Sequence, residues 1–315
     1  MKKAFVGALR LAVGLGALWF LLSRIDGDAA WSTLRSADPR WLGAALLAQV
    51  GSKLCWVLRW DRLLAAARHP RSPVELLRLI LLGLFFNNFL PTSVGGDVVR
   101  GVELARGGVP KALAATTVVA DRLVGLVALA LLAVLGGVAG YWLMPGQGPW
   151  VASVGFALFV ATAITVATRP QLLDQLGRIS GSGPIVTKGK KVVESMSFVS
   201  GQRSAVLTAL TFSLGLAACS ALYHWSVARA VGIDVPVMSW FVIVPAVMLF
   251  AALPISLNGL GVRELGFVGF LGTQGVPEER ATVFALLAFV GTLGFAVAGG
   301  VLFLAGDRSK VGGEA

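Results

Sequence analysis

The chain has 315 residues, of which 56% are hydrophobic and only 14% are charged. Soluble domains carry about a quarter charged residues, so this composition excludes an ordinary soluble globule and also a disordered or collagen-like chain. The apolar residues come in blocks of about 20, the length that a helix needs to cross a bilayer, rather than in the alternating strands of an outer-membrane barrel. The sequence therefore predicts an all-α polytopic membrane protein.

The net charge of +11 has a topological explanation. Its basic residues are dispersed among the apolar blocks without a nucleic-acid-binding signature, so we expect no nucleic acid partner. Short cytoplasmic loops of membrane proteins collect Lys and Arg, and this asymmetry orients the chain. The two cysteines lie inside apolar blocks and the two histidines lie far apart. We therefore expect neither a metal nor another cofactor.

The first membrane half is predicted over residues 1–168. Four of its apolar blocks are long enough to cross the bilayer. They cover residues 4–22, 41–60, 112–141 and 150–168. A basic cytoplasmic loop follows at residues 169–203, and the second half, residues 204–315, adds crossings near residues 205–227 and 281–305. The distribution of Lys and Arg places both termini in the cytoplasm.

Each half also contains one apolar block that is broken by helix-disrupting residues. Pro removes a backbone donor, Gly loosens the helix, and Asn is costly to expose to lipid, so the blocks near residues 74–106 and 237–273 are predicted to be re-entrant hairpins. The first break contains Asn87, Asn88, Pro91, Ser93, Gly95, Gly96, Asp97 and Arg100. The second contains Pro254, Ser256, Asn258, Gly259, Gly261, Arg263 and Glu264. The first hairpin opens inward and the second outward, which predicts an inverted repeat.

The two breaks share a spacing. Pro, Ser, Gly and Arg recur as Pro-x-Ser-x-x-Gly-x-x-x-Arg, starting at Pro91 and at Pro254, and the pattern ends at Arg100 and at Arg263. A broken helix presents unpaired N–H groups and a positive dipole end, and an arginine nearby supplies a forked set of donors that matches phosphate. We therefore expect both arginines to bind a phosphate between the two halves. The simpler alternative treats Pro and Gly as kinks and the arginines as interfacial side chains.

Several charged residues lie within the apolar blocks and are expected to face a cavity or one another, because a lone charge is costly in lipid. Asp97 and Arg100 are three residues apart and can pair on one helical face. Arg263 and Glu264 are adjacent and are expected to point apart, which leaves Glu264 in need of another partner. For Asp121 and Arg122 the sequence leaves two placements open, the membrane interface and a cavity.

Most tryptophans flank the predicted crossings and are explained by an interfacial belt. They include Trp41, Trp56, Trp60, Trp142, Trp150 and Trp240. Lys53, inside the second crossing, is expected to face the bundle or to reach toward the interface.

The two breaks, together with the pair Asp121 and Arg122, resemble the lysylphosphatidylglycerol synthase transmembrane family, a flippase-like membrane region. The resemblance covers nearly the whole chain. It implies handling of lipid-linked substrates at a bacterial or archaeal plasma membrane. The soluble aminoacyl-transferase domain of the fused family members has no counterpart in this sequence, so we do not expect lipid aminoacylation.

The leading hypothesis is a lipid translocator, rather than an enzyme, whose partner is an anionic phospholipid or a lipid-linked phosphate. Asp97 and Glu264 would set the charge of the site or carry a coupling proton. No Walker motif is present, so active transport would use an ion gradient or a partner. The alternatives are a membrane transferase acting on a polyprenyl-phosphate or phospholipid, which needs a general base or a metal-binding acid cluster, and a non-catalytic subunit of a glycolipid pathway.

Overall fold

The computed structural model describes residues 27–89, 95–143, 203–252, 256 and 258–311, together with the single positions Gly16 and Trp19. Apart from those two positions, the predicted crossings at residues 4–22 and 150–168 and the basic loop at 169–203 lie outside the described residues. All regular secondary structure within the described residues is helical, which confirms the predicted all-α class.

The described helices repeat in order and in length. After a short helix α2 (Gly27–Arg35), the first half contributes α3 (Pro39–Ala66), α4 (Pro73–Phe89), α5 (Gly95–Arg106) and α6 (Lys111–Leu143). The second half contributes α10 (Arg203–Ala230), α11 (Val237–Ala252), α12 (Val262–Thr273) and α13 (Glu278–Val311). The first four have 28, 17, 12 and 33 residues, and the second four have 28, 16, 12 and 34. Both described halves thus have the pattern long, short, short, long.

Four of the described helices, α3, α6, α10 and α13, are long and apolar enough to cross a membrane. The short pairs α4–α5 and α11–α12 lie where the sequence predicts the two hairpins. Local sequence sets several of the ends. Asp38 caps α3 by accepting a hydrogen bond from the backbone N–H of Arg40 at 2.8 Å, with Pro39 in the first turn, and Gly261 adopts a positive φ of 76° just before α12.

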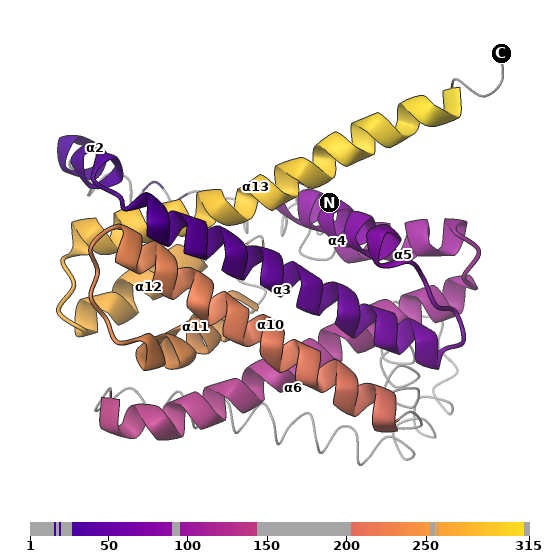
Figure 1. Ribbon diagram of the computed structural model, residues 1–315, viewed down its shortest axis with the longest axis horizontal. Helices are drawn as coiled ribbons and strands as arrows, with labels where there is room; N and C mark the ends of the chain where they lie inside the picture. Colours follow the sequence, from indigo (N-terminus) through magenta and orange to yellow (C-terminus); the bar gives the residue numbers. More distant parts are fainter. Residues whose placement is uncertain are drawn as a thin grey trace.

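The two halves cross where α3 and α10 pack side by side, as Figure 1 shows. Trp41 contacts Trp225 with ring centroids 4.9 Å apart, whereas farther along α3 the Arg59 side chain reaches Ser213. Residue numbers therefore rise along α3 as they fall along α10, so the two helices are antiparallel. Equal helix patterns related by an antiparallel pair are the arrangement of an inverted repeat.

Each half also packs a short helix against the long helix of the other half, α11 on α6 and α4 on α13. The contacts use glycines from a repeated segment, AVLGGV at residues 133–138 and AVAGGV at residues 296–301. A Cβ atom on Gly136 would overlap the carbonyl oxygen of Phe241, and one on Gly299 would overlap that of Leu81. Only glycine permits these backbones to approach so closely.

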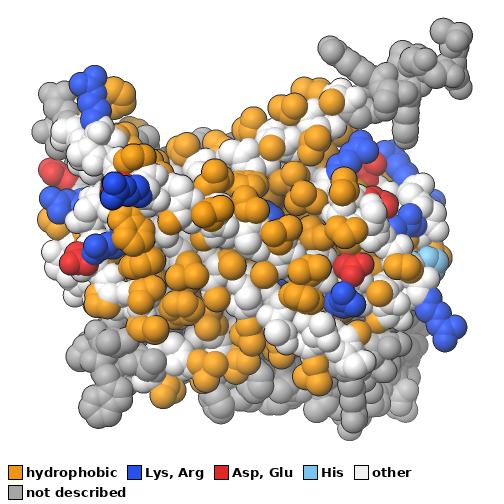
Figure 2. Space-filling view, viewed as in Figure 1, with side chains coloured by type: hydrophobic (Ala, Val, Ile, Leu, Met, Phe, Trp, Pro, Cys, Tyr) orange, Lys and Arg blue, Asp and Glu red, His pale blue; other side chains and the backbone are white. Residues whose placement is uncertain are grey.

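Side-chain distribution on the surface agrees with a membrane protein. Figure 2 shows hydrophobic side chains over the middle of the face formed by α3 and α10, with Lys and Arg side chains gathered toward its two ends. The interior of the second half is aromatic: Trp240, Phe267 and Phe284 pack together and are at most 1% exposed. The prediction that Trp240 belongs to an interfacial belt is therefore wrong, because its ring fills a core between helices.

We predict that Gly299→Ala destabilises the protein by about 1–3 kcal/mol, because the added methyl forces α13 away from α4. The matched control is Gly294→Ala on the same helix, where an added Cβ meets no atom within 4 Å. Because alanine is the better helix former by about 0.8–1.0 kcal/mol, the control is expected to be neutral or stabilising. Thermal unfolding in detergent micelles measures both. Equal melting temperatures for the two variants would contradict the close packing.

Candidate functional site

Polar side chains follow one face of α3 through its apolar length. Gln49, Ser52, Lys53, Trp56 and Arg59 recur at intervals of three and four residues, which places them on one side of a helix. Gln49, Ser52 and Arg59 are 5% exposed each, although they lie in a helix long enough to span the bilayer. Buried polar groups of this kind in a membrane helix mark a functional interior.

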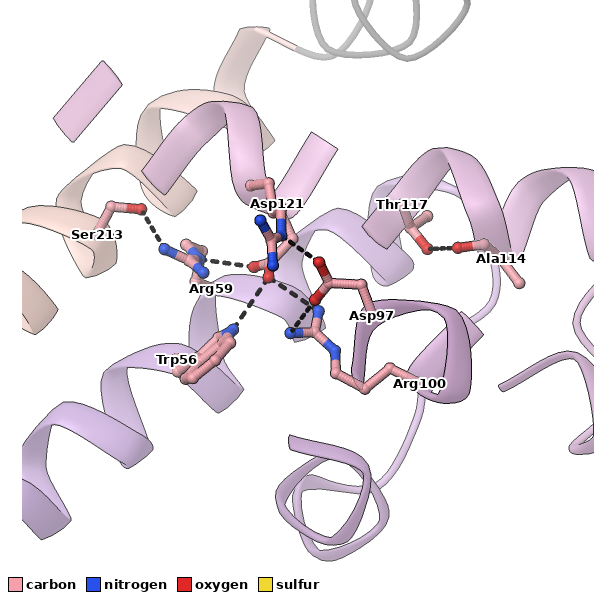
Figure 3. A network of polar contacts seen from close by, with 9 residues as sticks. Trp56, Arg59, Asp97, Arg100, Ala114, Thr117, Asp121 and Ser213 are labelled. Atoms are coloured by element: carbon pink, nitrogen blue, oxygen red, sulfur yellow. Dashed lines mark hydrogen bonds and ion pairs between the residues drawn. The ribbon is translucent and has the colours of Figure 1, made fainter. Parts of the chain in front are cut away.

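The first cluster is a network of ion pairs centred on Asp121 of α6 (Figure 3), which we call the Asp121 network. Its carboxylate accepts hydrogen bonds from Arg59 Nε at 2.6 Å, from Arg100 Nη2 at 3.0 Å and from Trp56 Nε1 at 3.0 Å. Asp121 is 0% exposed, so its side chain faces the interior of the helix bundle. Helices α3, α5 and α6 are thereby joined through one side chain.

A second carboxylate extends the Asp121 network. Asp97 lies 3.8 Å from Arg100 and also forms an ion pair with Arg122. The guanidinium of Arg100 lies over the ring of Trp60 at 4.3 Å and near that of Trp56 at 5.2 Å. The predicted pairing of Asp97 with Arg100 is confirmed. The prediction of an interfacial belt for Trp56 and Trp60 is wrong, because one donates to Asp121 and the other covers a buried arginine.

The Asp121 network contains three arginines and two aspartates, so its formal net charge is +1. Lone charges cost about 2.5–3.5 kcal/mol each at the centre of a membrane helix, and grouping opposite charges removes most of that cost. Arg59, Asp97, Arg100 and Asp121 are all at most 7% exposed. Only Arg122 reaches the surface, with 49% of its side chain exposed.

The second cluster is a cavity of about 160 Å³ beside the crossing of α3 and α10, which we call the crossing pocket. Its polar lining residues come from α3, α10, α12 and α13. They are Gln49, Ser52, Lys53, Trp56, Ser220, His224, Arg263 and Thr292. Lys53 donates hydrogen bonds to Gln49 Oε1 at 2.9 Å and to Ser52 Oγ at 3.2 Å. The crossing pocket therefore holds two cationic side chains, one from each half, and Trp56 connects it to the Asp121 network.

Arg263 and Glu264 do not point apart, contrary to the prediction from their adjacency. Nε and Nη2 of Arg263 lie 3.0 and 2.7 Å from Oε1 of Glu264. The other carboxylate oxygen, Oε2, accepts a hydrogen bond from the backbone N–H of Gly261 at 2.7 Å. Glu264 thus closes the first turn of α12 and orients Arg263 at the same time, because its side chain folds back over the helix end.

The shared sequence spacing of Arg100 and Arg263 is not a structural equivalence. Arg100 is the sixth residue of α5, and the sixth residue of α12 is Phe267. Arg100 lies over Trp60, the twenty-second residue of α3. Phe267 lies over His224, the twenty-second residue of α10, with ring centroids 4.7 Å apart. The third residues of α5 and α12 are Asp97 and Glu264, so these two acidic residues correspond to each other in the repeat. The second break is therefore four residues longer than the first.

The same comparison pairs Arg59 with Tyr223 and Asp121 with Ala288, each at matching positions in their helices. In the first half Arg59 donates to the Asp121 carboxylate, and in the second half Tyr223 donates to the carbonyl oxygen of Ala288 at 2.6 Å. The repeat thus conserves the geometry of the contact and replaces an ion pair by a neutral hydrogen bond. At these positions, therefore, only the first half carries charge.

The structure separates the remaining predicted site residues. Asn87 accepts a hydrogen bond from the backbone N–H of Gly96 at 2.9 Å and so ties α4 to the start of α5. Asn88 donates to the carbonyl of Leu84 on its own helix, and Asn258 is exposed with a φ of 50°. Three further positions, Pro91, Ser93 and Pro254, lie outside the described residues. Four other predicted site residues are described but belong neither to the Asp121 network nor to the lining of the crossing pocket. They are Gly95, Ser256, Gly259 and Gly261.

Sequence reasoning missed the contribution of α3. It does not single out Arg59 or His224, and both are buried within the bundle at 5% and 4% exposure. The available signal was the recurrence of polar residues every three to four positions from Gln49 to Arg59. A polar stripe on a helix long enough to cross the bilayer must face protein rather than lipid.

We predict that Asp121→Asn lowers the free energy of unfolding by about 3–5 kcal/mol, because it leaves buried Arg59 without a carboxylate and leaves Arg100 with only the more distant Asp97. The double variant Asp121→Asn with Arg59→Gln should lose less than the sum of the two single losses, since the second change removes one of the uncompensated charges. Melting temperatures in detergent for the four proteins form the test. Additive losses would show that the 2.6 Å contact carries no coupling.

The chain matches the model of the lysylphosphatidylglycerol synthase TM region over residues 7–300. A UPF0104 membrane protein of Methanocaldococcus jannaschii is 22% identical over 85% of this chain and 84% of its own length. UPF0104 membrane proteins of Pyrococcus horikoshii and Methanothermobacter thermautotrophicus are 27% and 28% identical over 38% and 51% of this chain and 36% and 50% of their own lengths. This chain, whose described residues form broken helices with buried charges, therefore belongs to the lysylphosphatidylglycerol synthase transmembrane family.

Proposed function

We propose that this protein translocates a phosphate-bearing lipid, or a lipid-linked substrate, across the membrane, and that the crossing pocket binds the phosphate. The observation that carries the proposal is the charge of that pocket. Lys53 and Arg263 line it from the two halves of the chain, and none of its described lining residues is a carboxylate. A small cavity lined by two cations, beside the crossing of an inverted repeat, is where such a transporter would bind an anion.

The size of the crossing pocket favours a head group over a whole lipid. Its volume of about 160 Å³ is below the range of about 300–1,000 Å³ that encloses drug-sized ligands. Acyl chains would therefore stay in the bilayer while the phosphate enters. Lys53 would supply a compact charge, and Arg263, whose fork is already oriented by Glu264, would supply directed donors.

In this proposal Arg100 has a different role from the one that the sequence suggests. It is 1% exposed and contacts two carboxylates and two tryptophans, and it does not line the crossing pocket. We therefore assign Arg100 to the Asp121 network, which fixes α5 against α3 and α6, and assign the phosphate to Lys53 and Arg263.

The test is lipid translocation by purified protein in proteoliposomes, with head-group-labelled phosphatidylglycerol and a membrane-impermeant quencher. Lys53→Gln should slow translocation by at least about tenfold, because it removes a charge-assisted contact worth about 1.5–3 kcal/mol. Arg263→Lys, which keeps the charge and loses the fork, should slow it less. Arg62→Gln is the control, since Arg62 is half-exposed and lies outside the crossing pocket.

Two outcomes would count against the proposal. Translocation by a folded Lys53→Gln variant at the wild-type rate would remove the crossing pocket from the mechanism. A folded wild type that moves no anionic lipid would remove unaided translocation, and mass spectrometry of the lipids then separates the alternatives. A chemically altered lipid would indicate a transferase, and unaltered lipids would direct the search to a partner protein.

A further inference from the structure

A second and larger cavity lies outside the crossing pocket, in a groove between α5 and α6. Its volume is about 840 Å³. The walls are mainly apolar and come from both helices: Val98, Gly101, Val102, Ala105, Ala115, Val118, Val119, Leu123 and Leu126. Several of these side chains are open to the surroundings, with Val98 61%, Val102 45% and Leu126 43% exposed. An exposed apolar groove along a membrane-spanning helix is open to lipid chains.

The charges of the groove are mostly positive and occur at two levels. Arg106 and Lys111 line one end, at the close of α5 and the start of α6. Arg122 and Asp97 line it farther along, and Arg122 lies about 16 Å from Lys111 at the rise of 1.5 Å per residue. Since a hydrocarbon core is about 30 Å thick, these two charged levels are separated by roughly half of the bilayer.

We infer that this groove binds an anionic phospholipid, with one acyl chain along the apolar walls and the phosphate on Arg122. Three cations and one carboxylate line the groove, so its charge complements a phosphate diester. The basic residues at the end attract the anionic head group, and Arg122 provides the forked donors deeper in the groove. The inference does not depend on translocation, because a lipid bound in this way can also be a resident one.

An exchange of ion pairs makes the binding feasible. Arg122 is engaged by Asp97, so the phosphate must compete with a carboxylate. Asp97 does not become a lone buried charge when it yields Arg122, because Arg100 already lies 3.8 Å away on the other side. The lipid phosphate thus takes the place of Asp97 at Arg122, while Asp97 keeps its ion pair with Arg100, so no buried charge loses its last partner. This rearrangement reaches Asp121 directly, since Arg100 also contacts its carboxylate.

The experiment is native mass spectrometry of the detergent-solubilised protein with equal amounts of phosphatidylglycerol and phosphatidylcholine, measuring the first saturable lipid adduct. The wild type should prefer phosphatidylglycerol by at least about tenfold, the effect of one charge-assisted contact. Arg122→Gln should abolish that preference. Arg62→Gln is the matched control, because its side chain is 50% exposed, beside 49% for Arg122, and also lies near an aspartate.

A second variant tests the groove apart from the charge. Gly101 lines the groove, and a Cβ there would meet its first neighbour, Val118, at 3.9 Å, so a leucine side chain can project into the space without displacing the helices. Gly101→Leu should weaken the adduct of both lipids without lowering the melting temperature, because leucine is a better helix former than glycine. Full binding by Gly101→Leu would overturn the groove as the site.

The position of the phosphate has its own test. Lys111→Gln should retain most of the preference for phosphatidylglycerol, because the proposed phosphate lies on Arg122 and Lys111 acts only at the end of the groove. If Lys111→Gln abolished the preference and Arg122→Gln kept it, the phosphate would lie at the membrane surface and the inference would be wrong. Absence of any preference in the wild type would also overturn it.

Discussion

The burial of one carboxylate inside the helix bundle constrains most of this structure. Asp121 accepts hydrogen bonds from Arg59, Arg100 and Trp56, which come from two other helices. A carboxylate at this depth is tolerated only when its charge is compensated and its lone pairs are used. The arginines that compensate it need partners of their own, and Asp97 supplies one. These contacts fix the positions of helices α3, α5 and α6 relative to one another, and so they also fix the position of the short helix α5 between the two cavities.

That arrangement places the Asp121 network between two cavities of different character. Trp56 belongs to the network and lines the crossing pocket, whereas Asp97 and Arg122 belong to it and line the groove between α5 and α6. An anion that binds Arg122 in the groove weakens the ion pair of Arg122 with Asp97. The effect reaches Arg100 and then Asp121, because each of these residues forms an ion pair with the one before it. Coupling of this kind needs only two arrangements of a few charged side chains. In the proposed function it would link lipid binding at the side of the protein to phosphate binding at its centre.

The inverted repeat explains how one chain supplies both sites. Corresponding positions of the two halves make the same contacts with different chemistry: Arg100 over Trp60 in one half, and Phe267 over His224 in the other. The first half thereby carries charges that hold its helices together, and the second half is held together by an aromatic core. Arg263, one turn before the position that matches Arg100, lies outside that core and lines the crossing pocket. The crossing pocket thus receives one cation from each half, Lys53 from the first and Arg263 from the second, although the two halves are held together by different interactions.

The sequence by itself determined the membrane class, the order of long and broken helices, and the concentration of charge at the breaks, because these follow from block length and from the cost of Pro, Gly and Asn in lipid. It also indicated the pairing of Asp97 with Arg100, since residues three apart are neighbours on one face of a helix. Only the tertiary structure decided which charges meet across helices. Asp121 lies 62 residues from Arg59 in sequence, and no local spacing links them. The tertiary structure likewise decided that Arg100 corresponds to Phe267. The second break has four more residues before its short helix begins, so Arg263, which matches Arg100 in the sequence motif, lies four residues before the structurally equivalent position in α12.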